Sequence, residues 1–150
     1  MKRFFFVSYL ILLSFILNQN LNSIENKIKL KHNYNNGSIF EGNWDGDGVF
    51  IENDGSYFEG EFLNGKLNGQ GSATYANGNV YIGQFLNDAF HGYGIYKYAE
   101  GEIYEGEYKN GQRNGIGTFI ALDNSTYVGD YENDMRHGYG EFTSEDDLYS

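Results

Sequence analysis

The sequence contains no cysteine, and this absence removes several classes of chemistry at once. Without thiols the chain forms no disulfide, holds no metal through thiolate ligands and has no cysteine nucleophile. Glycine is missing from residues 1–36, although residues 37–150 contain all 21 glycines. Basic residues are scarce in 37–150, where five face twenty acidic residues and the net charge is −15. Because nucleic acids and anionic lipid headgroups are bound through Lys and Arg, this composition predicts that residues 37–150 bind neither.

Long apolar runs are also missing, since the longest, Phe4–Leu17, has only 14 residues. A membrane-spanning helix needs about 20 apolar residues, whereas a signal-peptide core needs fewer. The run follows the basic start Met1-Lys2-Arg3, so we expect an apolar helix within a signal peptide or membrane anchor over residues 1–23. A buried apolar segment is the remaining alternative. The protein is therefore predicted to enter the secretory pathway and to be secreted or anchored, with any membrane contact made through Phe4–Leu17.

Residues 24–36 are rich in Asn and Lys and are predicted to form a polar linker. A capping strand is expected to begin near Lys29, because Tyr34 and Gly37 match late positions of the repeat described next.

A repeat of 23 residues organises the chain from residue 37 onward. Each copy starts with an aromatic residue followed two places later by glycine, and the first copy is five residues short. The copies begin at Phe40, Phe58, Tyr81, Tyr104 and Tyr127. Positions 3, 12 and 14 of the unit are glycine in all five copies. A fixed period of this kind indicates a repeat architecture, and these glycines stand where a positive φ or close packing is needed.

Large aromatic residues alternate with polar ones at the start of each unit, which is typical of a strand with one buried face. Positions 1 and 5 are aromatic in every copy, and they share a strand face with the glycine at position 3. We interpret this face either as a packed core or as a core that also lines a groove for a partner. The candidate partner-binding residues are Trp44, Phe58, Phe62, Tyr81, Phe85, Tyr104, Tyr108, Tyr127 and Tyr131.

Asparagine at position 7, followed by Gly or Asp, signals a turn after this strand, as at Asn64-Gly65 and Asn87-Asp88. A second strand is expected over positions 13–18, so each unit is a β-hairpin. The sequence therefore predicts an all-β fold, an elongated single-layer antiparallel sheet of tandem β-hairpins. Single hairpins are only marginally stable, so we expect neighbouring copies to stabilise one another.

The motif Tyr104-Glu105-Gly106-Glu107-Tyr108, followed by Asn114-Gly115-Ile116-Gly117, resembles the MORN repeat. Tyr81-Ile82-Gly83-Gln84-Phe85 with His91-Gly92-Tyr93-Gly94 is closer still. The resemblance covers residues 37–150, which we take as the repeat domain. It implies a single-layer β-sheet that mediates protein or membrane association and has no catalysis of its own.

Two sets of polar residues have the chemistry of possible sites. His91 and His137 occupy equivalent positions 46 residues apart. Four strand spacings of about 4.8 Å then separate them by roughly 19 Å, too far to share a metal ion. The pairs Glu59/Glu61 and Glu105/Glu107 are expected on a solvated acidic face. We therefore predict no catalytic, metal-binding or cofactor-binding residues.

Three functional hypotheses follow. The first is a non-enzymatic scaffold or adaptor that binds a protein partner, with its acidic surface favouring a basic one. The second is a homo-oligomeric structural protein that self-associates through the same face or the end strands. The third, from another class, is a glycan-binding or glycan-active protein that uses stacked Tyr rings.

Overall fold

The structure is a computed structural model that describes residues 30–144. The chain divides into two compact units, Met1–Leu30 and Lys31–Ser150. The predicted helix, with the signal or anchor segment 1–23, lies outside the described residues. Within 30–144 no helix has the length and apolar character needed to span a membrane.

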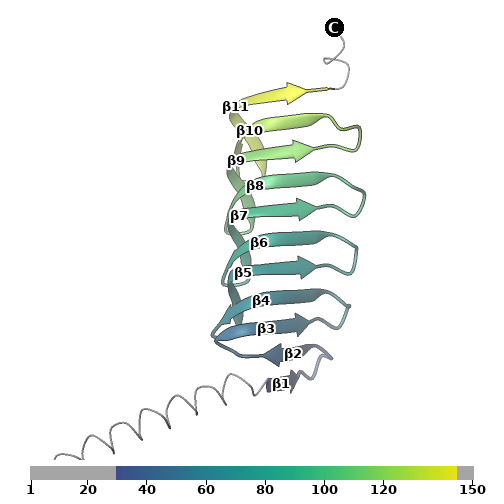
Figure 1. The fold of residues 1–150 in the computed structure, drawn as a ribbon, viewed down its shortest axis with the longest axis vertical. Coiled ribbons are helices and arrows are strands. Elements are labelled where there is room, and N and C mark those ends of the chain that lie inside the picture. The colour runs from purple at the N-terminus through teal and green to yellow at the C-terminus, as the bar shows by residue number, and fades with distance from the viewer. Residues whose placement is uncertain (1–29, 145–150) are drawn as a thin grey trace, which may run out of the picture. The chain divides into compact units, whose positions relative to one another are not determined.

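Eleven strands form one open sheet in which spatial order follows chain order (Figure 1). The predicted all-β, single-layer antiparallel architecture is confirmed. The strands are β1 (Leu30–Asn33), β2 (Ile39–Gly42), β3 (Gly46–Ile51), β4 (Tyr57–Leu63), β5 (Lys66–Thr74), β6 (Val80–Leu86), β7 (Ala89–Lys97), β8 (Ile103–Lys109), β9 (Gln112–Ile120), β10 (Thr126–Glu132) and β11 (Met135–Thr143).

Two-residue turns close the hairpins from β4 onward, at the Asn positions expected from the sequence. In the turn between β6 and β7, Asn87 and Asp88 have φ values of 51° and 70°. Positive φ at both central residues is what a type I′ turn requires, and Asn, Asp and Gly tolerate it best. The second strand of each hairpin was expected only from position 13, which was wrong. In the four full-length copies it begins at position 9, as at Ala89 in β7, because the tight turn brings the chain straight back into pairing.

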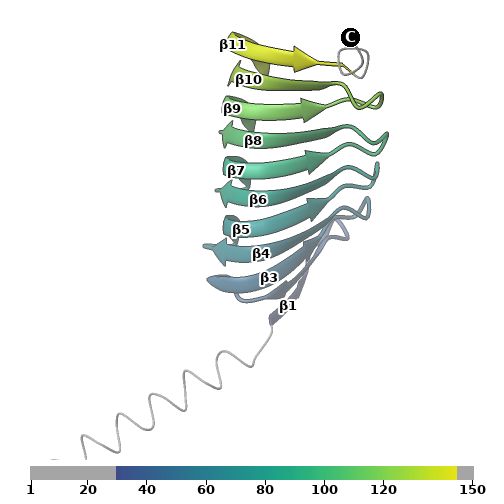
Figure 2. The same cartoon turned by 45° about the horizontal axis from the view of Figure 1, so that its top comes forward.

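Each hairpin bends where two glycines face each other, and the bend shapes the sheet. Gly83 pairs with Gly94, after which the register shifts and Gln84 pairs with His91. In a straight strand Tyr81 and Phe85 would lie about 13 Å apart, but their ring centroids are separated by only 5.1 Å. The bulge therefore folds each hairpin from β4 onward into two arms, and the strands curve together along the sheet (Figure 2).

The core lies between the two arms. Tyr81 has no exposed surface, and its ring stacks on Phe90 from the other arm with centroids 3.8 Å apart. Its hydroxyl donates a hydrogen bond to the carbonyl of Gln84 at 2.9 Å. A Cβ on Gly94 would overlap the Tyr81 ring, so the glycine pair makes the space that this ring fills.

Candidate interaction surface

Six of the nine aromatic residues predicted to bind a partner are buried in this core. They are Phe62, Tyr81, Phe85, Tyr104, Tyr108 and Tyr131. The remaining three, Trp44, Phe58 and Tyr127, are half-buried and pack against that core. The bend brings five of these rings together as edge-to-face neighbours, as between Tyr104 and Tyr108 at 5.3 Å, and Phe62 lies edge-to-face with Phe40. These six rings hold the arms together, and a partner would reach only their outer neighbours.

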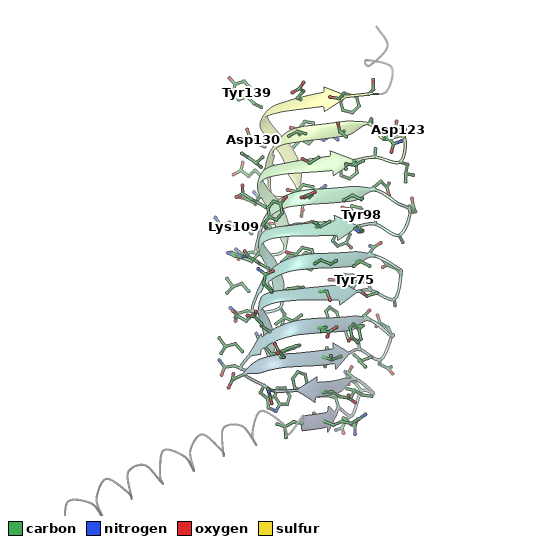
Figure 3. The ribbon with its side chains drawn as sticks, viewed as in Figure 1. Tyr75, Tyr98, Lys109, Asp123, Asp130 and Tyr139 are labelled. Atoms are coloured by element: carbon green, nitrogen blue, oxygen red, sulfur yellow. The ribbon has the colours of Figure 1, made fainter. Side chains whose placement is uncertain are left out.

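A second row of aromatic side chains remains accessible on the same face, and we call it the accessible stripe. It consists of Tyr34, Phe50, Phe58, Tyr75, Tyr96, Tyr98 and Phe119, all half-buried. Its rings contact one another in two runs, with Phe58 and Tyr75 at 5.7 Å in the first and Tyr96 and Tyr98 at 4.7 Å in the second. Figure 3 shows Tyr75 and Tyr98 one repeat apart, near the ends of β5 and β7.

Except for Phe58, the accessible stripe was not among the residues predicted from the sequence. Its members come mainly from positions 16 and 18 of the unit, which are aromatic in some copies only. Position 16, for example, is Tyr96 in one copy and Ala73 in another. The signal that could have found them is the alternation of apolar and polar residues continued through the second strand.

A hollow of about 450 Å³ opens on the accessible face near the start of the sheet. Four aromatic rings, including that of Phe62, form its apolar wall together with Leu67, and two carboxylates line it as well. Its main lining residues are Tyr34, Phe50, Glu52, Phe58, Leu67 and Asp88.

Further along the sheet, the same kind of surface is occupied by the protein's own arginines. The Arg113 guanidinium lies 5.5 Å from the Tyr104 ring centre and 5.3 Å from that of Tyr131. Arg113 also donates hydrogen bonds from Nε to Asp134 Oδ1 at 3.3 Å and from Nη2 to the Asp134 carbonyl at 2.7 Å. Arg136 lies over Tyr127 at 4.2 Å. The accessible face thus pairs rings with cations at its far end.

Comparison with known families identifies the repeat. The family model described as the MORN repeat matches four consecutive segments, 58–80, 81–103, 104–126 and 127–148. The chain belongs to the MORN-repeat family. No curated protein matches it as a relative. The copy that begins at Phe40 lies outside the matched segments, yet Gly42 pairs with Gly48 in the way that Gly60 pairs with Gly71. MORN repeats generally form non-catalytic scaffolds for protein or lipid interactions.

Several tyrosines of the MORN sheet have a raised pKa, which favours the neutral phenol. Burial, helped by the nearby Tyr96 hydroxyl and the charge of Glu52, raises the pKa of Tyr75 to about 12. Burial likewise raises the pKa of Tyr98 and, more strongly, that of Tyr108. At neutral pH Tyr75 and Tyr98 therefore offer aromatic surface and hydroxyl groups, and no phenolate charge.

The opposite face of the MORN sheet has polar side chains where the sequence placed an acidic surface. Glu59 accepts a hydrogen bond from the Tyr57 hydroxyl at 3.0 Å. Glu107 has a structural role that was not expected, because its Oε1 accepts the backbone N–H of Ile116 at 3.3 Å beside the bulge. Within residues 30–144 no group of three potential metal-binding side chains occurs.

Proposed function

We propose that this protein is a non-catalytic scaffold that binds a linear segment of a protein partner along the accessible stripe. The observation that supports the proposal is the row of half-buried rings on one face, which extends in two runs from Tyr34 beside β1 to Phe119 in β9. Exposed aromatic area arranged in a row is typical of interaction surfaces. The buried core rings hold this surface in place and do not take part in the contact.

The dimensions of the stripe suit an extended segment. The eight strand spacings between β1 and β9, at about 4.8 Å each, give a length of roughly 38 Å. An extended chain advances about 3.3 Å per residue, so roughly eleven residues would cover the stripe. Rings at successive repeats would then contact side chains spaced along that segment.

Charge would select among such segments. The repeat region has five basic residues against twenty acidic ones. Complementary charge speeds the encounter of partners and disfavours like-charged ones. We therefore expect a partner segment with basic residues, and we expect nucleic acid to be rejected.

The test compares partner recovery with variants on the two faces. Tyr75→Ser/Tyr98→Ser removes two rings of the stripe, whereas Tyr93→Ser removes a 54% exposed ring from the opposite face. We expect the first variant to lose the partner in a pull-down and the second to retain it, with both folded by circular dichroism. Unchanged recovery with the stripe variant, or equal loss with both, would rule the proposal out.

Self-association is a second candidate, and the end strand β11 favours it. β11 pairs with β10 alone among the described strands, and its Met135, Tyr139 and Phe142 are 66%, 91% and 57% exposed. Such an edge is a template for pairing with another chain. Tyr139→Lys should then lower the mass measured by light scattering at high concentration, and a monomeric wild type would exclude this candidate.

Export is also part of the proposal, with Phe4–Leu17 acting as a signal peptide or anchor. The basic start and the apolar run in the sequence support it. N-terminal sequencing of the mature protein tests it, because a new terminus near residue 23 indicates cleavage and an intact Met1 in the membrane fraction indicates an anchor. An intact chain that fractionates away from membranes would contradict both.

A further inference from the structure

Leu67 and Arg113 occupy the same position in two different repeats, and each is held by the aspartate of the next turn. Asp88 Oδ1 accepts the backbone N–H of Leu67 at 2.8 Å, and Asp134 Oδ1 accepts that of Arg113 at 2.9 Å. In return, the backbone N–H of Asp88 donates to the Leu67 carbonyl, and that of Asp134 donates to the Arg113 carbonyl. The two sites therefore share one backbone frame and differ in the side chain at this position.

At the Arg113 site the frame holds a cation. The guanidinium lies beside the Tyr104 and Tyr131 rings, and both the side chain and the carbonyl of Asp134 accept its hydrogen bonds. Rings and a carboxylate around a cation form a known recognition unit, since the ring faces attract positive charge.

At the Leu67 site Phe58 has the position of Tyr104, the second ring is Phe50 from the paired strand, and two carboxylates line the hollow, but no cationic side chain does. Leu67 is too short to fill the site, and the hollow of about 450 Å³ opens there. Phe50 and Phe58 line this hollow with ring centroids 6.2 Å apart, and Glu52 and Asp88 line it as well. Within residues 30–144 neither carboxylate is paired with a Lys, Arg or His side chain.

We propose that this hollow is a binding site for an arginine side chain of the partner segment, which takes the place that Arg113 fills internally. The inference rests on the proposed function, because the arginine arrives on a segment bound along the accessible stripe. Arginine fits better than lysine, since its flat guanidinium stacks on rings while donating to a carboxylate.

The probes are two short fluorescein-labelled peptides of alternating Ser and Thr, one with a central arginine and one with citrulline at that place. Citrulline keeps the shape of arginine and removes its charge. Binding to the full-length protein is measured by fluorescence anisotropy. We expect the arginine peptide to bind about tenfold more tightly, the scale of one charge-assisted hydrogen bond.

Charge-only variants locate the site. Asp88→Asn keeps an oxygen for the Leu67 N–H, and Glu52→Gln keeps the shape of its side chain. Each should weaken the arginine peptide by about tenfold and leave the citrulline peptide unchanged. Glu59→Gln is the matched control, because it removes the same charge from the opposite face and should leave both affinities unchanged.

Leu67→Arg tests the same idea from the other side, since an internal guanidinium would fill the hollow and exclude the arginine peptide. If this variant does not fold, the charge-only variants still decide. Equal affinity for the arginine and citrulline peptides, or equal effects of Glu52→Gln and Glu59→Gln, would overturn the arginine site and leave the peptide-binding proposal standing. Failure of both peptides to bind would also overturn the arginine site. The proposed function would then be tested separately, by partner recovery with Tyr75→Ser/Tyr98→Ser.

Discussion

The Tyr81 ring lies parallel to the Phe90 ring, with centroids 3.8 Å apart and planes 15° from each other. The two residues belong to different arms of one bent hairpin, so their contact closes the arms over the core. The Tyr81 hydroxyl fixes the ring further through the carbonyl of Gln84. The free energy of unfolding should therefore depend on the Tyr81 hydroxyl, whereas the hydroxyl of an exposed tyrosine should contribute little.

Tyr81→Phe is expected to lower the free energy of unfolding by about 1 kcal/mol, because the Gln84 carbonyl loses a buried donor. Tyr93→Phe is the matched control, since its hydroxyl bonds Glu105 on an exposed face. That change should stay within about 0.5 kcal/mol. Urea unfolding measures both, and equal effects would show that the buried hydroxyl has no special role.

Gly94→Ala should destabilise the protein by about 1–3 kcal/mol, as overpacking of a core does. The added Cβ would overlap the Tyr81 ring. Combining it with Tyr81→Ala removes the obstacle, so the double variant should be more stable than the sum of the two single effects predicts. Strict additivity in urea unfolding would contradict a steric cause. Gly111→Ala is the control, because an added Cβ there meets nothing within 4 Å and adds only backbone strain at φ +85°.

The hairpins could be predicted from the sequence because their signals are local. Alternation at Tyr104-Glu105-Gly106 sets a strand, and Asn110-Gly111 sets the turn. The strand order follows, since consecutive hairpins pair in sequence. The first part of the second strand was not predicted, and the glycines at positions 12 and 14 lie within that strand, at the bulge.

The interaction surface could not be predicted in the same way, because it depends on the angle of the bend. On a straight strand, Tyr81 and Phe85 would both present their rings outward; the bend turns them toward each other and toward Phe90. The hollow depends on the same geometry. In the sequence Leu67 looks like an ordinary apolar residue. Its importance becomes clear only because it has the same place in its repeat as Arg113 has in another copy.

Glu107 should behave as a hydrogen-bond acceptor and not as an acid. In the preceding repeat Gln84 accepts the Tyr93 N–H at 3.4 Å, so an uncharged amide accepts the equivalent backbone hydrogen bond. Glu107→Gln should therefore change the free energy of unfolding by less than about 0.5 kcal/mol, whereas Glu107→Ala should cost about 1 kcal/mol. Glu100→Ala, in an exposed turn, is the control for loss of charge. Equal effects of the Gln and Ala variants in thermal unfolding would refute the assignment.

Stability should fall in alkali over a defined window, and Tyr75 should contribute to the fall. Burial raises its pKa from the ordinary 10 to about 12 in the folded state, which favours the neutral phenol. A group whose folded pKa is raised contributes stability that is fully present below pH 10 and is lost as the pH rises toward 12. Tyr75→Phe cannot ionise, so its unfolding free energy should decline less steeply across that window than the wild type's. Below the window, near about pH 8, the difference between the two proteins should be constant. Urea unfolding as a function of pH measures this, and parallel curves for the two proteins between pH 10 and 12 would show that Tyr75 does not titrate with folding.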